Sequence, residues 1–401
     1  MQDFLIPRLT KAANFGLRRS GLSVVAIAIL AFFGIGAQVL HAQVYDLVDL
    51  AAPPENGQKA FLSMPAAMND RAQVTGIADL GSGNQSAFLY RPRNEKETAV
   101  EYLDENPAIS SRGFGINSVG DVVGDVSIAR QRDVRHATLF RNGKTLDLGV
   151  LQEGDSSRAN SINASGLVVG FSGPGRDSNA SRAFLWSAAT GMVDLGTLGG
   201  KYAQAFAIND SGYVTGTSQV SPLISHAPGG THAFLYQPLS IPAPPIVRML
   251  DLGTLGGQNS YGTAINASNH VVGYSLINTF DNRIHAFLHD GTQLRDLGSL
   301  GPNRIQTDNS AALGINGIDQ VVGWTLIEPN SEFGISAPNG PVQQVAFIYT
   351  NGIMRNLNDL IGDAAKNYLL FSATAINNKG QIIASALDRS TNQVRAVLLT
   401  P

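Results

Sequence analysis

The sequence lacks cysteine altogether, and this absence excludes disulfide bridges, thiolate metal sites and cysteine nucleophiles. Charged residues are also scarce, at 15% of the chain against about 25% in ordinary domains. The 28 basic and 31 acidic side chains leave no basic excess, so we expect no nucleic-acid partner. Hydrophobic residues make up 43% of the 401 residues, and 43 glycines indicate many tight turns. The chain can therefore fill a core without cross-links.

Long hydrophobic runs are missing as well, except near the N-terminus. Four basic residues come first: Arg8, Lys11, Arg18 and Arg19. The apolar stretch Leu22–Ala37 follows them, and Ala42 ends a small-residue cleavage pattern. This order predicts a signal peptide over residues 1–42 and an extracellular or periplasmic location. The stretch is shorter than the roughly 20 residues of a membrane span, which favours cleavage over the alternative of an uncleaved anchor. We expect no membrane span in residues 43–401.

A small residue, an apolar residue and an asparagine recur seven times along the rest of the chain. The asparagines, spaced 48, 46, 46, 57, 50 and 61 residues apart, are Asn69, Asn117, Asn163, Asn209, Asn266, Asn316 and Asn377. The position two before each asparagine is always Ala, Gly or Ser, which predicts a crowded line with no room for large side chains. Turn formers such as Asp210-Ser211-Gly212 follow and predict a tight hairpin.

Three further markers complete each repeat. A run such as Val168-Val169-Gly170 comes first, then one such as Ala183-Phe184-Leu185-Trp186, then one such as Asp194-Leu195-Gly196. Odd and even positions of the Ala-Phe-Leu run are both apolar, which indicates strands that are covered on both faces. The sequence thus predicts four short strands in every repeat.

Four short strands cannot bury two faces alone, so the repeats must stack against one another. Four-stranded units that repeat at this length are typical of β-propeller blades, whereas the coils of a solenoid, the alternative, are usually shorter. Tyr45–Leu50 matches the fourth strand of a unit, and the segments between Ala375 and Leu399 match the first three. We therefore predict an all-β, seven-bladed propeller over residues 43–401, with four antiparallel strands per blade. The N-terminal strand and three C-terminal strands would close the last blade.

Several of these motifs resemble those of a known family. The segments that carry the resemblance are His232–Tyr236, His285–Leu288, Arg182–Trp186, Asp194–Gly200 and Asp251–Gly257. They are similar to the repeats of bacterial HAF-repeat proteins, which are described as extracellular repeat proteins. The resemblance covers most of residues 43–401 and implies an exported protein with no defined biochemical activity.

Residues that could carry chemistry favour structural roles. Three histidines share one repeat position: His136, His232 and His285. Four aspartates share another: Asp147, Asp194, Asp251 and Asp296. Rotational repetition would place each set on separate blades, so we predict no metal site and expect each aspartate to cap its own turn. The sequence has no Gly-x-Ser-x-Gly, no His-Glu-x-x-His and no acidic calcium loop. We therefore predict no catalytic residue and no cofactor.

Variable loop length is the remaining functional signal. The links from second to third strands and from fourth to first strands vary in length and should open on one rim, where repeat proteins build binding faces. The residues predicted there are Tyr202, Tyr261, Phe280, Arg283, Trp324 and Phe333. The first hypothesis is a monomeric, non-catalytic module that binds a surface polymer, carbohydrate or protein. The alternatives are an extracellular carbohydrate-active hydrolase or lyase and a structural envelope component.

Overall fold

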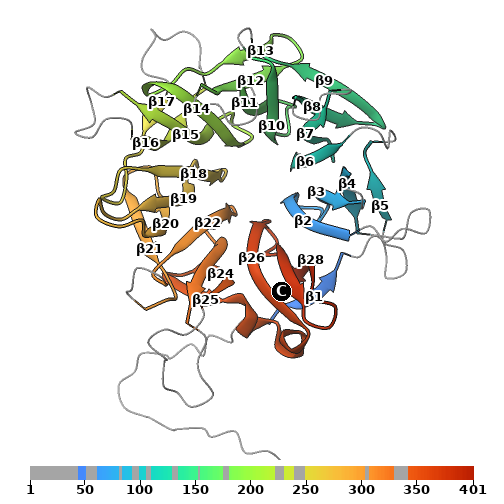
Figure 1. Ribbon diagram of the computed structural model, residues 1–401, viewed down its shortest axis with the longest axis vertical. Coiled ribbons are helices and arrows are strands. Elements are labelled where there is room, and N and C mark those ends of the chain that lie inside the picture. The colour runs from blue at the N-terminus through green and yellow to red at the C-terminus, as the bar shows by residue number, and fades with distance from the viewer. Residues whose placement is uncertain are drawn as a thin grey trace, which may run out of the picture. The chain divides into compact units, whose positions relative to one another are not determined.

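The computed structural model describes residues 44–50, 61–80, 84–92, 99–104, 110–128, 134–151, 154–174, 180–221, 230–238, 249–302, 307–328 and 342–401. All of them belong to one compact unit, Ala42–Pro401. They form seven antiparallel sheets of four strands each. Figure 1 shows the sheets following one another around a central axis as the blades of a β-propeller. The predicted signal peptide, residues 1–42, lies outside the described residues.

In each blade the first strand lies nearest the axis and the fourth lies outermost (Figure 1). Blade 1 contains β2 (Phe61–Met68), β3 (Val74–Asp79), β4 (Gln85–Arg91) and β5 (Ala99–Tyr102). Blade 2 contains β6 (Ser111–Ile116), β7 (Val122–Ser127), β8 (Arg135–Arg141) and β9 (Lys144–Gly149). Blade 3 contains β10 (Ser156–Ile162), β11 (Val168–Gly173), β12 (Arg182–Ser187) and β13 (Gly191–Asp194).

The remaining blades follow the same order. Blade 4 contains β14 (Gly199–Ile208), β15 (Val214–Val220), β16 (Thr231–Tyr236) and β17 (Met249–Asp251). Blade 5 contains β18 (Ser260–Ile265), β19 (Val271–Leu276), β20 (Ile284–His289) and β21 (Leu294–Gly298). Blade 6 contains β22 (Ser310–Ile315), β23 (Val321–Ile327), β24 (Gln343–Thr350) and β25 (Ile353–Asn356), and two 3-10 turns follow it, η1 (Leu357–Leu360) and η2 (Gly362–Lys366).

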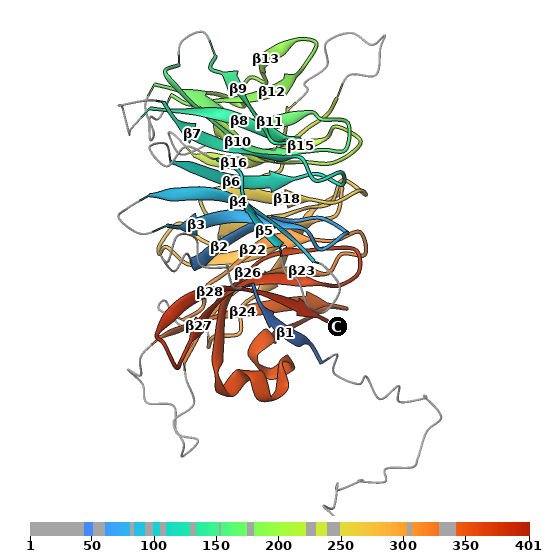
Figure 2. The ribbon, with the colours of Figure 1, turned by 90° about the vertical axis from the view of Figure 1, so that its right-hand side faces the viewer.

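Blade 7 joins the beginning and the end of the propeller. It contains β26 (Tyr368–Ile376), β27 (Ile382–Asp388), β28 (Gln393–Thr400) and, as its fourth strand, β1 (Asp46–Asp49). Strand β1 pairs with β28 in a register that sets Asp46 opposite Thr400 and Asp49 opposite Val397. The prediction of seven blades closed by the N-terminal strand is confirmed. Figure 2 shows the ring from the side.

The core lies between the blades because every third strand is buried on both faces. In β4, Phe88 and Tyr90 pack with Ile383 and Leu398 of blade 7. Ala87 and Leu89 of the same strand point the other way and pack with residues of blade 2 such as Phe140. The alternation of a strand thus divides one apolar run between two neighbouring cores. This explains why the Ala-Phe-Leu runs show no polar face.

The first strands approach one another closely around the axis. A Cβ atom on Gly115 of β6 would lie 2.8 Å from the Cα atom of Ser161 on β10, and one on Gly314 of β22 would lie 2.9 Å from the Cα atom of Ala375 on β26. These are the positions two before each repeated asparagine. Larger side chains would force the blades apart, so the predicted crowded line is present.

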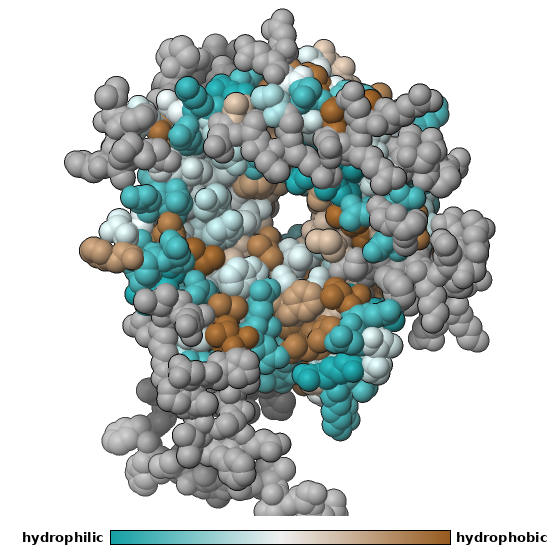
Figure 3. Space-filling view, viewed as in Figure 1, coloured by the Kyte–Doolittle hydropathy of each residue, from teal (hydrophilic) through white to brown (hydrophobic). Residues whose placement is uncertain are grey.

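The connections divide between two rims. The first-to-second and third-to-fourth connections open on one rim, which we call the asparagine rim because the repeated asparagines lie there. The second-to-third and fourth-to-first connections open on the other, which we call the long-loop rim. Figure 3 shows an opening at the centre of the ring. Within the described ranges, no helix reaches the length and hydrophobicity needed to cross a bilayer.

Candidate functional site: a channel with two unlike ends

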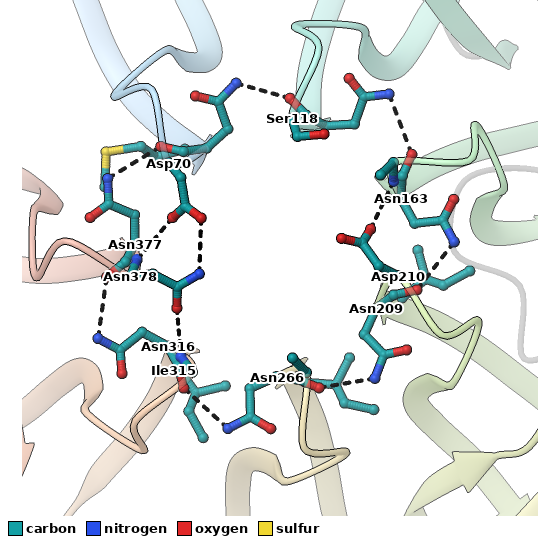
Figure 4. A pocket seen from close by; sticks show the side chains of 18 of the residues that line it. Asp70, Ser118, Asn163, Asn209, Asp210, Asn266, Ile315, Asn316, Asn377 and Asn378 are labelled. Carbon is teal, nitrogen blue, oxygen red and sulfur yellow. Dashed lines mark hydrogen bonds between the residues drawn. The ribbon is translucent and has the colours of Figure 1, made fainter.

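The seven repeated asparagines form a closed hydrogen-bonded ring at one end of the channel (Figure 4). The Nδ2 atom of each asparagine donates to the backbone carbonyl oxygen of the asparagine on the next blade, at 2.9 to 3.3 Å. The last of these bonds runs from Asn377 to Asn69 and therefore crosses the seam between blades 7 and 1. The ring fastens each blade to its neighbour.

The geometry requires an asparagine because the same side chain must donate and accept. While Nδ2 reaches the next blade, Oδ1 accepts the backbone N–H four residues later, as Tyr213 N–H donates to Asn209 at 3.0 Å. All seven asparagines make this second contact, at 2.9 to 3.1 Å. An aspartate could cap the turn but could not donate to the next blade. The sequence motif predicts the turn but does not predict the hydrogen bond to the next blade.

A cavity of about 310 Å³ lies inside the ring. Turn residues add further links between blades: Asn378 Nδ2 donates to Asp70 at 2.9 Å, and the backbone N–H of Ala164 donates to Asp210 at 2.8 Å. In six of the seven asparagines, Nδ2 also donates to the side-chain oxygen of another residue. The side-chain amides of the ring are thus hydrogen-bonded to other protein groups, and these bonds hold neighbouring blades together.

The long-loop end of the channel is built from different residues on each blade. Of the predicted binding residues, Tyr202 lies on β14, Tyr261 on β18 and Trp324 on β23, each half-buried. Phe280 and Arg283 lie in the connection between β19 and β20. Phe333 lies outside the described residues. The five described residues therefore all lie toward the long-loop rim, on blades 4 to 6.

Tyr261, one of the predicted tyrosines, stacks on a second tyrosine of its own blade. The rings of Tyr261 and Tyr274 stack with centroids 4.8 Å apart and an angle of 22° between their planes. Burial raises the pKa of Tyr202 to about 12, and repulsion from Tyr261 and Tyr274 in their ionised forms adds to the rise. Tyr202, on the adjacent blade 4, is therefore within electrostatic range of the pair on blade 5. We call these three residues the tyrosine group.

Sequence reasoning missed Tyr274, although a signal was available. Tyr274 follows Val271-Val272-Gly273 and stands opposite Tyr261 in the register of β18 and β19. Residues opposite each other in an antiparallel pair point to the same face. Trp324 follows the same Val-Val-Gly run on blade 6, where its partner in register is Ala311.

Arg283 holds two carboxylates together rather than presenting its charge to a ligand. Its Nε donates to Asp281 at 3.1 Å and its Nη1 donates to Asp308 at 3.0 Å. Asp308 also accepts from Ser299, at 2.8 Å, and lies 2.9 Å from Nε2 of His285. The link between blades 5 and 6 at this rim is therefore ionic. Phe280, in contrast, is 95% exposed at the tip of its connection.

The repeated histidines and aspartates have the structural roles that the sequence predicted. His136, His232 and His285 each lie within 2.9 Å of the aspartate on the fourth strand of their own blade. Each of the four repeated aspartates accepts the backbone N–H of the glycine two residues later, at 2.7 to 2.8 Å. Among the described residues, no cluster of three or more His, Asp or Glu side chains is arranged to hold a metal ion.

The family comparison corrects one expectation. Residues 200–397, from β14 into β28, match the sequence model of a family described as protein of unknown function (DUF3466). The HAF-repeat assignment is therefore wrong. The motifs misled because each has a structural role: Ala-Phe-Leu fills the space between blades and Asp-Leu-Gly caps a turn. Any propeller under these constraints can repeat them. A comparison with curated proteins gives no significant match.

Comparison with solved structures shows the fold. The β-propeller domain of the trilobed protease from Pyrococcus furiosus, described as having an open velcro topology, aligns with a TM-score of 0.50 at 9% identity. The alignment covers 84% of this chain and 95% of that one. A gluconolactonase from Xanthomonas campestris aligns with a TM-score of 0.38 at 9% identity, over 91% of this chain and 93% of its own. The pairing of β1 with β28 gives the present propeller a closed seam.

Proposed function

We propose that the chain is an exported, non-catalytic module that binds a surface polymer, carbohydrate or protein at the long-loop end of its channel. The stacked pair of Tyr261 and Tyr274 is the observation that carries this proposal, and Tyr202 on the adjacent blade lies within electrostatic range of it. Aromatic side chains supply large apolar faces and a polar hydroxyl, and they lose little freedom on binding. A polysaccharide suits such a surface because a sugar ring also has an apolar face and a polar edge.

Two carboxylates at the long-loop rim, between blades 5 and 6, support a binding role over hydrolysis. A glycoside hydrolase needs one carboxyl group that is protonated near neutral pH, and therefore one with a raised pKa. Burial raises the pKa of Asp308, but hydrogen bonds from Ser299, His285 and Arg283, with the charge of His285, outweigh it and lower the pKa overall. The backbone N–H of Arg283 and its guanidinium lower the pKa of Asp281. Both groups are suited to ion pairing.

The proposal of export is supported by the N-terminal sequence alone. Basic residues, an apolar stretch and Ala42 follow one another in the order of a secretory signal. Expression of the full chain in a bacterial host, followed by fractionation and N-terminal sequencing, tests this part. Recovery of a chain that starts near residue 43 outside the cytoplasm is expected, whereas an intact chain in the cytoplasm would contradict it.

A binding screen with two matched variants tests the module itself. The purified chain is applied to glycan, polymer and protein arrays, and the hits are titrated with Tyr261→Ala and Tyr213→Ala. Tyr213 is a half-buried tyrosine on blade 4 at the asparagine rim, the end of the channel opposite the tyrosine group. We expect Tyr261→Ala to weaken binding by about tenfold, as for an aromatic residue at a binding hot spot, and Tyr213→Ala to leave it unchanged. Turnover of a bound glycan, or equal effects of the two variants, would overturn the proposal.

A further inference from the structure

A group of arginines lies on blades 2 and 3, next to the blades that carry the tyrosine group. Asp125 on β7 is 1% exposed and accepts hydrogen bonds from three of them. Nε of Arg112 donates at 2.8 Å, Nε of Arg135 at 2.6 Å and Nε of Arg158, which comes from blade 3, at 3.1 Å. Burial raises the pKa of Asp125, but the hydrogen bond from Arg112 and the three positive charges outweigh it and lower the pKa overall. Asp125 is therefore an ionised anchor.

Aromatic rings pack against two of these arginines. The guanidinium carbon of Arg158 lies 4.8 Å from the ring centre of Phe114 and 5.4 Å from that of Phe171. Arg112 lies 5.4 Å from the ring centre of Phe114. A guanidinium has five N–H donors in one plane, a geometry that matches both oxygens of a carboxylate. The side chain of Arg158 is 30% exposed, against 5% for Arg135, so Arg158 is the more accessible of the two.

Two of the arginines and Tyr261 lie at the same height along the first strands of their blades. Arg112, Arg158 and Tyr261 each stand five residues before the ring asparagine of their blade. Five residues of strand span about 16 Å, so all three lie near the long-loop end, away from the asparagine ring. Gln204 occupies this position on blade 4, between Arg158 and Tyr261. Blades 2 to 5 therefore present two arginines, a glutamine and a tyrosine along one arc.

We infer that the ligand of this channel end is a polysaccharide that bears carboxylate groups, with a carboxylate on Arg158 and sugar rings on the tyrosine group. The inference rests on the proposed function and narrows it to one class of ligand. The chain has a formal net charge of −3, so its overall field does not attract a polyanion. Selectivity must then come from local contacts, and a guanidinium over phenylalanine rings on blade 3, with the stacked tyrosines two blades further along the arc, provides them.

A matched pair of polymers tests the inference. The full chain is titrated with polygalacturonate and with its fully methyl-esterified form, which keeps the sugar backbone but removes the charge. Alginate and dextran sulfate are titrated alongside as a second carboxylated polymer and a sulfated one. A hydrogen bond to a charged group supports an expected preference of about tenfold or more for polygalacturonate over its ester. Tryptophan fluorescence, compared between the unmodified chain and Trp324→Phe, provides a readout local to the adjoining blade, since the second tryptophan, Trp186, is present in both.

Three arginine variants separate binding from stability. Arg158→Gln should lower the affinity for polygalacturonate to that for the ester, and Arg158→Lys should restore part of the preference because it keeps the charge without the planar fork. Arg182→Gln is the control, since Arg182 on β12 of the same blade pairs with Asp194 on the fourth strand. It should keep the full preference. Thermal melting of each variant measures its loss of stability separately from its loss of binding. The comparison of the two polymers on the unmodified chain tests the inference even if a variant fails to fold.

The possible outcomes distinguish this inference from the proposed function. Equal affinity for polygalacturonate and its ester, or tighter binding of dextran sulfate, would overturn the inference and leave the proposed function intact. Binding of a neutral ligand with no binding of polygalacturonate or alginate would do the same. Absence of any ligand in the array screen would overturn both. A preference that disappears in Arg158→Gln and survives in Arg182→Gln supports both.

Discussion

The two ends of the channel are built from the same seven first strands, but one end has the same residue on every blade and the other has different residues. At the asparagine end, every blade uses the same residue and the same bond to its neighbour. Five residues earlier, no two blades but those of Arg112 and Arg158 agree: the residues are Met64, Arg112, Arg158, Gln204, Tyr261, Ala311 and Ser372. Uniformity marks the end where blades must join, and variety marks the end where we propose that a ligand binds.

The difference follows from what each end must satisfy. A ring closes only if every blade presents a donor and an acceptor to its neighbours, so one exception would break the circuit. The side chains at the other end pack in local groups, such as the stacked pair on blade 5 and the arginines around Asp125. Each local group can change without altering its counterparts on distant blades.

The largest effect on stability is expected from Asn209→Asp. This change removes the donors to the carbonyl of Asn266 and to Oδ1 of Asn269, and it sets a carboxylate oxygen against each acceptor. Loss of one buried and one partly buried hydrogen bond, with added repulsion, should lower the free energy of unfolding by about 2 to 4 kcal/mol. Urea denaturation measures the loss.

Asn142→Asp is the matched control for that change. Asn142 lies in the exposed turn between β8 and β9 with φ of 53°, a conformation that aspartate tolerates nearly as well as asparagine. It should change stability by less than about 0.5 kcal/mol. Equal effects of the two substitutions would mean that the ring does not fasten the blades.

Much of the fold could be predicted from the sequence because the pattern of apolar residues in each repeat shows which strand faces are buried. Phe184 and Leu185 point to opposite faces, yet both are apolar, and this pattern required neighbours on both sides. The asparagine ring could not be predicted in the same way, since its bonds join residues 46 to 61 positions apart within the series and 308 apart at the seam. A local motif shows that Asn209 can form a turn. It does not show what lies across the blade boundary.

The candidate site was predictable in outline only. Loop variation predicts the binding residues Tyr202 and Tyr261, which lie on first strands toward the long-loop rim, but it does not indicate that Arg283 is held by Asp281 and Asp308. Tyr274 was missed because it lies within a strand, where an aromatic residue ordinarily fills a core. The register of two strands was needed to set it against Tyr261.

A smaller effect on stability, and one that depends on pH, is expected at the long-loop end. Burial lowers the pKa of His285, but Asp296 and Asp308 outweigh it and raise the pKa above 6.5 overall. The protonated ring, with Arg283, then holds Asp308 at the junction of blades 5 and 6. Because the pKa of His285 is higher in the folded protein than in the unfolded chain, its protonation stabilises the fold fully below pH 6.5. This stabilisation is lost as the pH rises through the pKa of the folded state.

Urea denaturation at a series of pH values from about 6 to about 9 measures this dependence. The free energy of unfolding should fall with rising pH in the unmodified chain. The fall attributable to His285 should disappear in His285→Gln. An identical fall in both proteins would show that this junction does not depend on the charge of the ring. The asparagine ring contains no titratable donor, so Asn209→Asp should cost stability even at high pH.

The smallest effect is expected from Phe280→Ala. Phe280 is 95% exposed, so its truncation leaves no cavity, and stability should change by less than about 0.5 kcal/mol. Thermal melting checks this expectation. A larger loss would show that the tip of the long-loop rim contributes to the fold, and the contrast between the two ends would weaken.

Hydrogen–deuterium exchange with and without polygalacturonate tests the division between the two ends most directly. The amide of Tyr213, bonded to the ring asparagine Asn209, should exchange slowly in both states. Peptides that contain Tyr202, Tyr261 and Arg158 should gain protection only when the polymer is bound. Protection that instead appears at the asparagine turns on binding, or fast exchange there in the free protein, would contradict the account.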